Sequence, residues 1–566
     1  MKTNFILALS LIMLLSCSKE PKEVVINPHD VNELTNLEVL CQVWGLVKYH
    51  HPAFMVGSTH DDDADLLELI PKIRGADAVT RNQILLDWIN GLGAYSSSKN
   101  GWDVYVKSKR LYSQTTTPVN MVEMSWIEDD YILGKALSAE LPKVRYASRL
   151  EGSKYVRMEG TLPSFIEEEY AHITNPSVEY RLLALFRYWN IVEYFYPLKN
   201  LLPGHWNNVL TDHIPLFIEA TERLEYRKAM ARLITETCDE VGFVHERDIV
   251  PVFGNRKVSS GFFTTSIIED KLIVTSASTE VQIKRGDEIV SMGGRSLSDV
   301  KRLILEYLKF SNEGNLLNLM NFYATTTNDL TLSVTYLSDG ELKTEDFPTL
   351  YQYREEPSQE VVSTRAFPVA YTLAEGGGIG YINGAYYSAS EASAMMNSLK
   401  ETKGIIIDLR GSIQNMLPLA YGYFTNSVVW CLEWGQVDPM TPGIIYIYSQ
   451  SNDWFSANYM TYSGKVVIIV NESTGGVGEA GAVVLQTIPG VITIGSQTVG
   501  GFYNSNQIVF PGNISTRMTN TYTRSYNGRE LQLDGVPIDI EVKPTIAGIK
   551  AGRDELYEKA VELILN

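Results

Sequence analysis

The sequence is poor in cysteine, with 4 cysteines in 566 residues. Apart from Cys17 near the N-terminus, only Cys41, Cys238 and Cys431 remain, and they lie far apart. An odd number of distant cysteines gives no disulfide framework, and no cysteine or histidine spacing matches a zinc site. We therefore expect neither a disulfide scaffold nor a metal site, and no motif predicts a cofactor.

Basic residues are also scarce relative to acids. The chain has 48 lysines and arginines against 67 aspartates and glutamates, a net charge of −19. This balance argues against nucleic acid and anionic membrane surfaces as partners, and its simplest role is solubility. With 45% hydrophobic and 20% charged residues the chain can bury large cores, and its length predicts about three or four domains.

Long apolar runs are absent except at the N-terminus, where "MKTNFILALSLIMLLSC" has one lysine, an apolar core and a small residue before Cys17. This stretch is too short for a spanning helix and indicates an export signal over residues 1–17. "LLSC" resembles a bacterial lipobox, which implies lipidation of Cys17; simple signal-peptide cleavage is the alternative. We expect an outer-membrane lipoprotein of a Gram-negative bacterium, facing the periplasm or the cell surface and touching the membrane only through its lipid.

An internal repeat follows. "LCQVWGLVKYHHP" (Leu40 to Pro52) matches "LFRYWNIVEYFYP" (Leu185 to Pro197) at an offset of 145. Apolar spacing of three and four predicts amphipathic helices that end at proline, and the aromatic residues are expected in the core. We predict two related helical modules over 30–160 and 161–257. The first also contains strands, because residues 103–160 have strand-like stretches such as "DVYVKSKRLY".

Residues 258–350 form a third section. "KLIVTSAS" and "LTLSVTYLSDGEL" predict strands with turns, and "SDVKRLILEYL" predicts an amphipathic helix. "IKRGDEIVSMGGRSLSDV" resembles the distal half of a PDZ domain. PDZ domains bind extended peptides at a sheet edge, and the resemblance implies peptide binding at Gly261, Phe262 and Phe263.

Residues 351–378 are polar and irregular and predict a linker. From residue 379 onward, apolar strands such as "GIIIDLR", "KVVIIV" and "VITIGS" alternate with the helical patterns "SEASAMMNSLKET" and "GEAGAVVLQTI". This alternation predicts a parallel, buried α/β core over residues 379–566.

These strings occur in the order of one family. A PDZ-like unit, "IGYIN", "KGIIIDLRG", "VVIIVNEST", "VITIGSQTVGG" and "GVPIDIEVKPT" together resemble the carboxyl-terminal processing (tail-specific) serine peptidases and their tricorn-like relatives among Bacteroidetes lipoproteins. The resemblance implies a multidomain α+β and α/β fold. It would combine helical repeat modules, a PDZ-like domain and a crotonase-like α/β superhelix.

The resemblance also locates the positions of the chemistry. The family nucleophile, a serine three residues before a glutamate, falls on Gly476, with the glutamate at Glu479. The lysine base of one subgroup falls on Gly501, and the histidine of the tricorn-like subgroup falls on Val241. Covalent acyl transfer needs a hydroxyl or thiol beside a base, so all three positions lack the required side chain. Oxyanion-stabilising backbone N–H groups are expected at Gly411, Gly476 and Val477.

Other residues offer an alternative chemistry. Ser473 and Ser412 lie near the predicted loop, and His245 follows Val241 by four residues, so a displaced serine–histidine pair is a second hypothesis. Turn or helix capping is the simpler role of Ser473 and Thr474. His50 and His51 favour helix-end packing over metal binding, and the aspartates of "HDDDADLLEL" favour a helix N-terminus.

Three functions follow from the sequence. The first is a catalytically degenerate peptidase homologue that binds peptides or unfolded protein segments. The second is an active serine peptidase with a displaced nucleophile. The third is an envelope scaffold that binds through its helical repeats.

Overall fold

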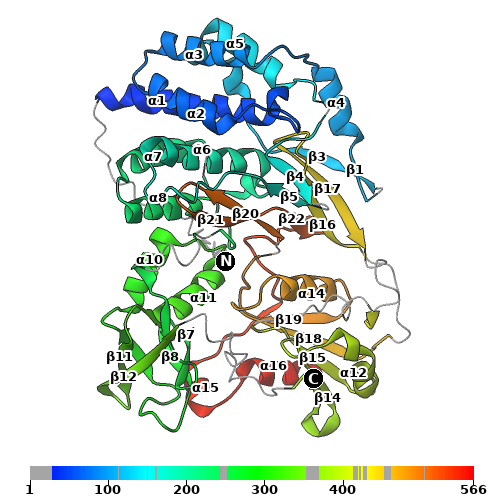
Figure 1. Cartoon of the computed structure of the whole chain (residues 1–566). Coiled ribbons are helices and arrows are strands. Elements are labelled where there is room, and N and C mark those ends of the chain that lie inside the picture. Colours follow the sequence, from blue (N-terminus) through cyan, green and yellow to red (C-terminus); the bar gives the residue numbers. More distant parts are fainter. Residues whose placement is uncertain are drawn as a thin grey trace, which may run out of the picture.

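The computed structural model describes residues 28–112, 114–149, 151–159, 162–204, 206–242, 244, 251–351, 369–411, 419, 422–424, 430–451, 461–501 and 504–566. Figure 1 shows helices in two layers at the top, strands beneath them, and two further units side by side at the bottom. The fold is a mixed α/β arrangement of several units.

The uppermost layer is helical. Its long helix α1 ends at His50, close to Pro52, as the proline rule predicts. Asp61 caps α2 by accepting the N–H of Ala64 at 3.2 Å. The elements of this layer are α1 (Pro28–His50), η1 (Pro52–Phe54), α2 (Asp62–Arg74), α3 (Ala78–Gly91), α4 (Lys99–Ser108), β1 (Arg110–Leu111), β2 (Gln114–Thr115), η2 (Ser125–Glu128) and α5 (Asp130–Arg145).

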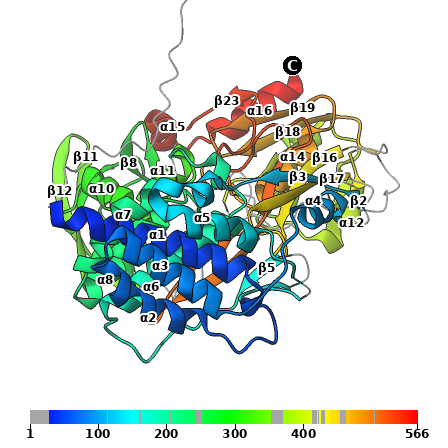
Figure 2. The same ribbon diagram turned by 90° about the horizontal axis from the view of Figure 1, so that it is seen from above.

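The second helical layer lies directly beneath the first. Every residue of α6 from Arg181 to Phe195 is buried, because this helix lies between the upper helices and the strands below it. The layer contains β4 (Val156–Glu159), β5 (Leu162–Phe165), α6 (Val178–Phe195), η3 (Lys199–Leu201), α7 (Asn208–Glu219) and α8 (Arg223–Thr235). Figure 2 shows both helical layers from above, covering the same side of the molecule.

The helices that carry the repeated motif pack against each other. The rings of Tyr49 and Tyr194, which are matched positions, lie edge to face at 5.6 Å between centroids. At another matched pair, a Cβ on Gly45 would come within 1.7 Å of the Asn190 Oδ1 atom. The glycine on α1 therefore makes room for the asparagine on α6, and the two segments form one packed pair.

The lower left unit in Figure 1 contains a seven-stranded sheet in the order β10-β6-β12-β11-β9-β8-β7. β7 is at the edge. Ser296 and Asp299 form a capping box at the start of α10. The elements are β6 (Arg256–Val258), β7 (Phe263–Ile268), β8 (Lys271–Ala277), β9 (Glu288–Met292), α10 (Leu297–Tyr307), α11 (Glu313–Ala324), β10 (Thr326–Thr327), β11 (Thr331–Ser338) and β12 (Glu341–Tyr351).

The lower right unit contains a six-stranded sheet in the order β13-β14-β15-β18-β19-β23. From β14 to β23 the strands are parallel, as the apolar runs predict. Helices α12 and α14 pack on one face of the sheet and α16 on the other. The elements are β13 (Tyr371–Ala374), η4 (Glu375–Gly377), β14 (Ile379–Asn383), η5 (Ala389–Glu391), α12 (Ala392–Leu399), β15 (Gly404–Asp408), β18 (Lys465–Val470), α14 (Val477–Gln486), β19 (Val491–Gly495), β23 (Ile540–Glu541) and α16 (Glu555–Leu565). The short helix α15 (Ile546–Ala551) packs instead on the lower left unit, through Ile549 against Ile268 and Ile273.

A smaller, four-stranded sheet combines strands from the N-terminal and C-terminal parts of the chain. Its order is β22-β16-β17-β3, and β3 (Thr117–Asn120) comes from the first helical layer. Its other strands are β16 (Trp430–Val437), β17 (Ile444–Ser451) and β22 (Tyr522–Ser525). The hairpin of β20 (Ser505–Phe510) and β21 (Ile514–Thr519) lies beneath α6 and α8.

Two expectations from the sequence are wrong. The stretch "DVYVKSKRLY" forms mainly α4 rather than a strand, because Ser98 caps a helix there and Trp102 stacks on buried His50 at 6.0 Å. Within the predicted linker, residues 371–374 form β13, which pairs antiparallel with β14. In both places tertiary contacts override the local pattern.

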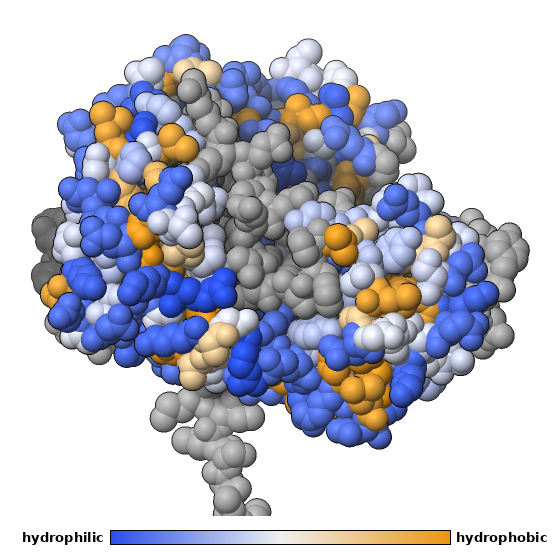
Figure 3. Space-filling view, turned by 90° about the horizontal axis from the view of Figure 1, so that it is seen from below, coloured by the Kyte–Doolittle hydropathy of each residue, from blue (hydrophilic) through white to orange (hydrophobic). Residues whose placement is uncertain are grey.

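Figure 3 shows the face formed by the two lower units, where hydrophilic residues surround small apolar patches. None of the helices in the described residues is both long enough and apolar enough to cross a membrane.

Candidate functional site

The predicted nucleophile loop connects β18 to α14. Gly476 is the N-cap of α14 and has φ 52° and ψ −117°, a conformation that L-residues rarely adopt. Thr474 is buried beneath the loop, where its Oγ1 donates to the Leu409 carbonyl at 2.7 Å and accepts the Asn471 N–H at 3.0 Å. The chain therefore makes a sharp strand-to-helix turn with Gly476 at its tip.

Glu479 joins this loop to the turn that contains Gly501. Its buried carboxylate accepts the N–H of Gly500 at 2.7 Å, the N–H of Gly501 at 2.9 Å and the hydroxyl of Thr498. The Gly476 N–H in turn donates to the Gly501 carbonyl at 3.0 Å. Burial raises the pKa of Glu479 to about 7, against the lowering effect of these hydrogen bonds. The structure thus brings together Gly476 and Gly501, the predicted nucleophile and lysine positions.

The turn after α8 carries the third position, Val241. The Val241 N–H donates to Asp239 Oδ1 at 3.2 Å, and Asp239 also accepts the N–H and the hydroxyl of Thr519 at 2.7 and 2.8 Å. Next to Val241, the Glu240 carboxyl is near enough to Glu479 to be repelled by it. Burial is the larger cause and this repulsion the smaller one, and together they raise the pKa of the Glu240 carboxyl to about 8. The turn that carries Val241 is therefore adjacent to the Glu479 loop.

The expected oxyanion donors differ in their availability. Gly476 uses its N–H in the bond to Gly501, so an oxyanion there would have to compete with that bond. Val477 is the first residue of α14, a position whose N–H has no intrahelical acceptor, and the residue is 44% exposed. Gly411 has φ 78° and follows Arg410, which is buried between Asp408 and Asp554 at 2.6 and 2.8 Å.

The fallback nucleophiles are only partly described. The Ser473 N–H donates to Asn471 Oδ1 at 3.1 Å, which is a turn contact, and Ser473 lies at the edge of a cleft. Ser412 and His245 lie outside the described residues, as does Cys17.

His50 and His51 are buried at the end of α1: His50 Nδ1 contacts the Leu46 carbonyl, and His51 Nδ1 accepts the Ala53 N–H. In the parts of the chain that are described, no cluster of three or more His, Cys, Asp or Glu could hold a metal.

A cleft separates this loop from the seven-stranded sheet, and we call it the β7 cleft. It has a volume of about 80 Å³. Edge strand β7 and helix α11 form one side, and Gly411, Asn471 and Ser473 are on the other. Gly261 and Phe262 lie in the turn before β7, and Phe263, its first residue, is buried against Phe347. The cleft is lined by β7 residues 265–268 rather than by Gly261, Phe262 or Phe263.

Helix α11 is attached to the Gly501 turn. Asn312, the N-cap of α11, donates to the carbonyls of Thr498 at 2.8 Å, Val499 at 3.0 Å and Leu533 at 2.8 Å. The Ser311 hydroxyl also donates to the Val499 carbonyl. One wall of the β7 cleft is thus hydrogen-bonded to the turn that Glu479 holds.

Comparison with known proteins decides the family. The sequence model of peptidase family S41 matches residues 378–542. This segment belongs to peptidase family S41. No curated protein matches the chain significantly.

Solved structures show the fold beyond the S41 segment. Mature CPAF matches with a TM-score of 0.52 at 12% identity, over 68% of this chain and 96% of that one. A candidate peptidase from Parabacteroides merdae matches with a TM-score of 0.44 at 15% identity, over 69% and 98% of the two chains. A photosystem II D1 C-terminal processing protease matches with a TM-score of 0.39 at 15% identity, over 64% and 93%. At these identities the likeness to CPAF concerns the fold alone.

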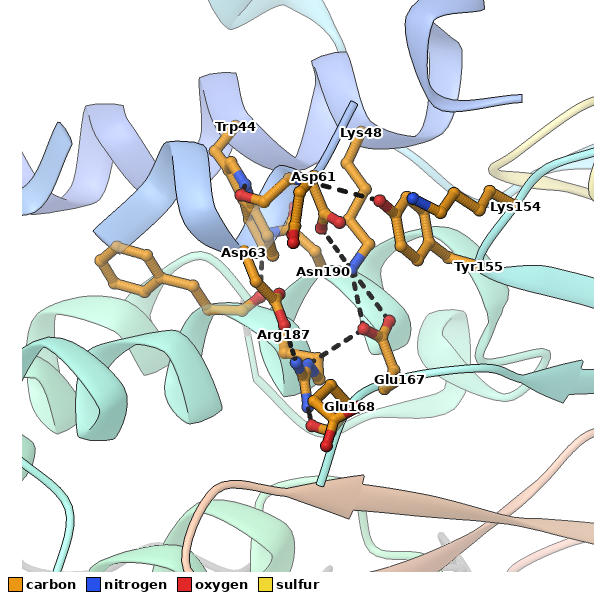
Figure 4. Close-up of polar contacts among 12 residues, drawn as sticks. Trp44, Lys48, Asp61, Asp63, Lys154, Tyr155, Glu167, Glu168, Arg187 and Asn190 are labelled. Carbon is orange, nitrogen blue, oxygen red and sulfur yellow. Dashed lines mark hydrogen bonds and ion pairs between the residues drawn. The ribbon is translucent and has the colours of Figure 1, made fainter. Parts of the chain in front are cut away.

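A second polar constellation lies outside the S41 segment, between the two helical layers. Figure 4 shows Lys48 pointing from α1 toward Glu167, with Arg187 of α6 on the other side of that carboxylate. Lys48 Nζ lies 2.7 Å from Asp62 and 2.9 Å from Glu167. Arg187 lies 2.7 Å from Asp63 and 3.1 Å from Glu167. All five side chains are at most 6% exposed, and we call them the buried ion cluster.

Sequence reasoning missed this cluster. It assigned the aspartates to a helix N-terminus, which is confirmed, because Asp61 caps α2 and Asp62 and Asp63 lie in its first turn. It did not show that the side chains of Asp62 and Asp63 also form buried ion pairs. A signal was present in the repeat, because Lys48 falls on an apolar-flanked position of α1 whose match in α6 is Glu193. Burial raises the pKa of Asp62 and of Glu167, while Lys48 acts in the opposite direction on both and Arg187 does so on Glu167. The cluster joins the helical layers and, within the described part of the chain, does not contact Gly476, Gly501 or Val241.

Proposed function

We propose that the protein is a tail-specific peptidase homologue of the cell envelope that has lost catalysis and acts by binding peptide or unfolded protein segments. The observation that carries this proposal is the 3.0 Å hydrogen bond between Gly476 and Gly501. It joins the positions expected for the nucleophile and the base, and neither residue has a side chain. Glu479 holds the nucleophile loop against the Gly501 turn, whereas the three matched positions carry neither a hydroxyl nor a base.

The β7 cleft supports binding as the remaining activity. β7 is an edge strand, so its outer backbone groups can pair with an added strand, as in PDZ domains. Opposite β7, the cleft reaches Gly411 and Ser473 beside the nucleophile loop. A segment that extended β7 would thus lead toward Gly476. The PDZ-like character of this unit and the crotonase-like character of the S41 segment are part of the proposal.

Turnover and covalent labelling test the loss of catalysis. Purified protein is incubated with fluorescent casein and, separately, with a phosphonate that labels activated serines. We expect neither cleavage above the buffer rate nor a mass increase. Cleavage or labelling would overturn the proposal and favour the displaced nucleophile. In that case Ser473→Ala, Ser412→Ala and His245→Ala should each lower the residual rate.

Binding is tested at the β7 cleft. A fluorescent peptide from reduced casein with a free carboxyl terminus should bind the wild type and should bind Ser266→Arg at least about tenfold more weakly, because the arginine occupies the cleft. Ser298→Arg, at an exposed position of α10, is the matched control and should bind normally. Equal binding to Ser266→Arg would refute a role for this cleft and favour a scaffold that binds through the helical layers.

The envelope location depends on lipidation of Cys17. We expect metabolic labelling with an alkyne-bearing palmitate to mark the wild type and not Cys17→Ala, and the variant to leave the membrane fraction. A labelled Cys17→Ala protein would exclude this anchor.

A further inference from the structure

The small sheet carries a second concave surface, which we call the sheet groove. It has a volume of about 480 Å³ and shares no lining residue with the β7 cleft. This volume is within the usual range for ligand sites, about 300–1,000 Å³. Its floor is one face of β22, β16, β17 and β3, and residues 197–201 at the end of α6 form a wall. The groove thus lies between the helical layers and the C-terminal part of the chain.

The middle of the floor is aliphatic. Ile445 and Ile447 of β17 lie beside Val119 and Thr117 of β3 in the strand register. Across β17, Gly435 pairs with Ile447. A Cβ at this glycine would come within 2.6 Å of the Ile445 side chain. A larger residue there would displace the Ile445 side chain, which lines the groove, so the glycine helps to keep that part of the floor in place.

One end of the groove carries an excess of negative charge. Glu433 and Arg524 are cross-strand partners, with 2.5 Å between Arg524 Nε and Glu433 Oε2. Glu530 accepts the hydroxyl of Tyr522 at 2.5 Å through Oε1, while its buried Oε2 has no hydrogen-bond partner among the described residues. Two carboxylates thus face one guanidinium, and one carboxylate oxygen keeps unused acceptor capacity.

An aromatic surface continues the groove past this end. Trp430 lines the groove, is 43% exposed and stacks on Tyr526 at 5.7 Å between ring centroids. An exposed indole face attracts both apolar groups and cations. The aliphatic floor, the acidic end and the aromatic face therefore follow one another along one surface of the groove.

We propose that the sheet groove binds an extended peptide segment that places a basic side chain between apolar ones on the same face. Alternate residues of an extended peptide point to the same side, so apolar groups can cover Ile445 and Ile447 while the cation meets Glu530 and Trp430. A saccharide is less suited to the middle of the floor, where Ile445, Ile447 and Val119 offer its hydroxyls no partner, and polar lining residues such as Gln114 and Asn200 make a sugar probe part of the test. Nucleic acid would be repelled by the acidic end. The groove is a second binding site, independent of the β7 cleft.

The test uses a fluorescent heptapeptide blocked at both ends, in which valine, lysine and valine alternate with serine. The blocked carboxyl terminus distinguishes this peptide from the free-carboxyl peptide used for the β7 cleft. We expect saturable binding by anisotropy to the full chain. Replacing the lysine by norleucine should weaken binding about threefold or more, and replacing it by glutamate about tenfold or more. Equal affinity for the lysine and glutamate peptides would overturn the proposal.

Two variants and one control locate the site. Ile447→Lys should weaken binding at least about tenfold by charging the floor, and the conservative Glu530→Gln should remove the preference for lysine over norleucine. Leu342→Lys, an equivalent change at an exposed position of β12, should bind like the wild type. Thermal unfolding curves confirm that each variant is folded. Unchanged binding to both Ile447→Lys and Glu530→Gln would overturn the proposal.

Photocrosslinking and a sugar probe complete the test. A benzophenone heptapeptide should mark tryptic fragments that contain β3 or β17. Marking of the β7 fragment alone would instead assign the peptide to the β7 cleft. Binding of maltohexaose, lost in Ile447→Lys, together with no binding of the lysine peptide, would make the groove a saccharide site and refute the proposal.

Discussion

Two buried polar constellations in this protein are held in opposite ways. The Glu479 loop satisfies one carboxylate with two backbone N–H groups and a hydroxyl, so it needs few side chains. The buried ion cluster instead opposes three carboxylates with Lys48 and Arg187, so each carboxylate depends on one of two cations. Side chains can be lost from the first arrangement without leaving a buried charge unpaired. In the second, the loss of either cation leaves a buried carboxylate without its counter-charge.

Breaking the ion cluster should have the largest effect. Lys48→Met keeps the length of the side chain and removes its charge, which leaves Asp62 and Glu167 in a buried, like-charged environment. We expect the free energy of unfolding to fall by about 3–5 kcal/mol in urea denaturation at pH 7. Lys72→Met is the matched control, because its partner Glu68 is exposed on α2; its cost should be within about 0.5 kcal/mol. Similar losses in the two variants would contradict the comparison.

Removing the charge from the Glu479 loop should cost less. Glu479→Gln keeps one acceptor oxygen but turns an amide NH₂ toward the backbone N–H of either Gly500 or Gly501. We expect a loss of about 1–3 kcal/mol at pH 8, where the carboxylate is ionised. Glu472→Gln, in the same loop and bonded only to Ser496 at 2.9 Å, should change stability by less. A larger loss from Glu472→Gln would show that Glu479 is not what holds the loop.

The α/β core could be predicted from the sequence because its signals are local. Apolar runs such as "GIIID" and "KVVIIV" are β15 and β18, and the helix after "NESTGG" is α14. The proximity of Gly476 and Gly501 could also be predicted, because the parallel neighbours β18 and β19 end at the same edge of the sheet. Local periodicity and strand order were enough for both.

The remainder depends on contacts between distant residues. β3 pairs with β17 across more than 300 positions of sequence, and nothing in "TPVN" indicates that partner. Glu167, which completes the ion cluster, lies 119 residues from Lys48. The Glu240 carboxyl looked unremarkable in "CDEVG", because only folding places it near Glu479. Local sequence patterns cannot show which charged side chains come together only when the chain folds.

Acidic groups near the nucleophile loop should make stability depend on pH. The pKa values of Asp239, Glu240 and Glu479 are raised to about 6, 8 and 7, so the folded state binds these protons more tightly than the unfolded state does. Their contribution to stability is therefore complete below about pH 4.5 and is lost as pH rises through these folded-state values. In Glu240→Gln the decline between pH 7 and 9 should be smaller, by about 1 kcal/mol at pH 9.

Thermal unfolding from pH 5 to pH 9 measures this difference. Glu341→Gln, at an exposed position of β12 in the seven-stranded sheet, controls for the loss of one negative charge. An identical decline in wild type and Glu240→Gln would show that the Glu240 carboxyl does not titrate in the folded protein.

Restoring a single side chain to the loop should have the smallest effect on catalytic activity. Gly476→Ser places a hydroxyl at the tip of the turn, where φ 52° and ψ −117° cost an L-residue about 1–2 kcal/mol. It should remain unlabelled by the serine-directed phosphonate, because Gly501 and Val241 supply no base. Gly476→Ser/Gly501→Lys adds the amine on the residue that already bonds to position 476. Labelling of the double variant alone would show that the frame still fits the chemistry. Labelling of the single variant would reveal a base elsewhere in the site and would favour the hypothesis of an active peptidase with a displaced nucleophile.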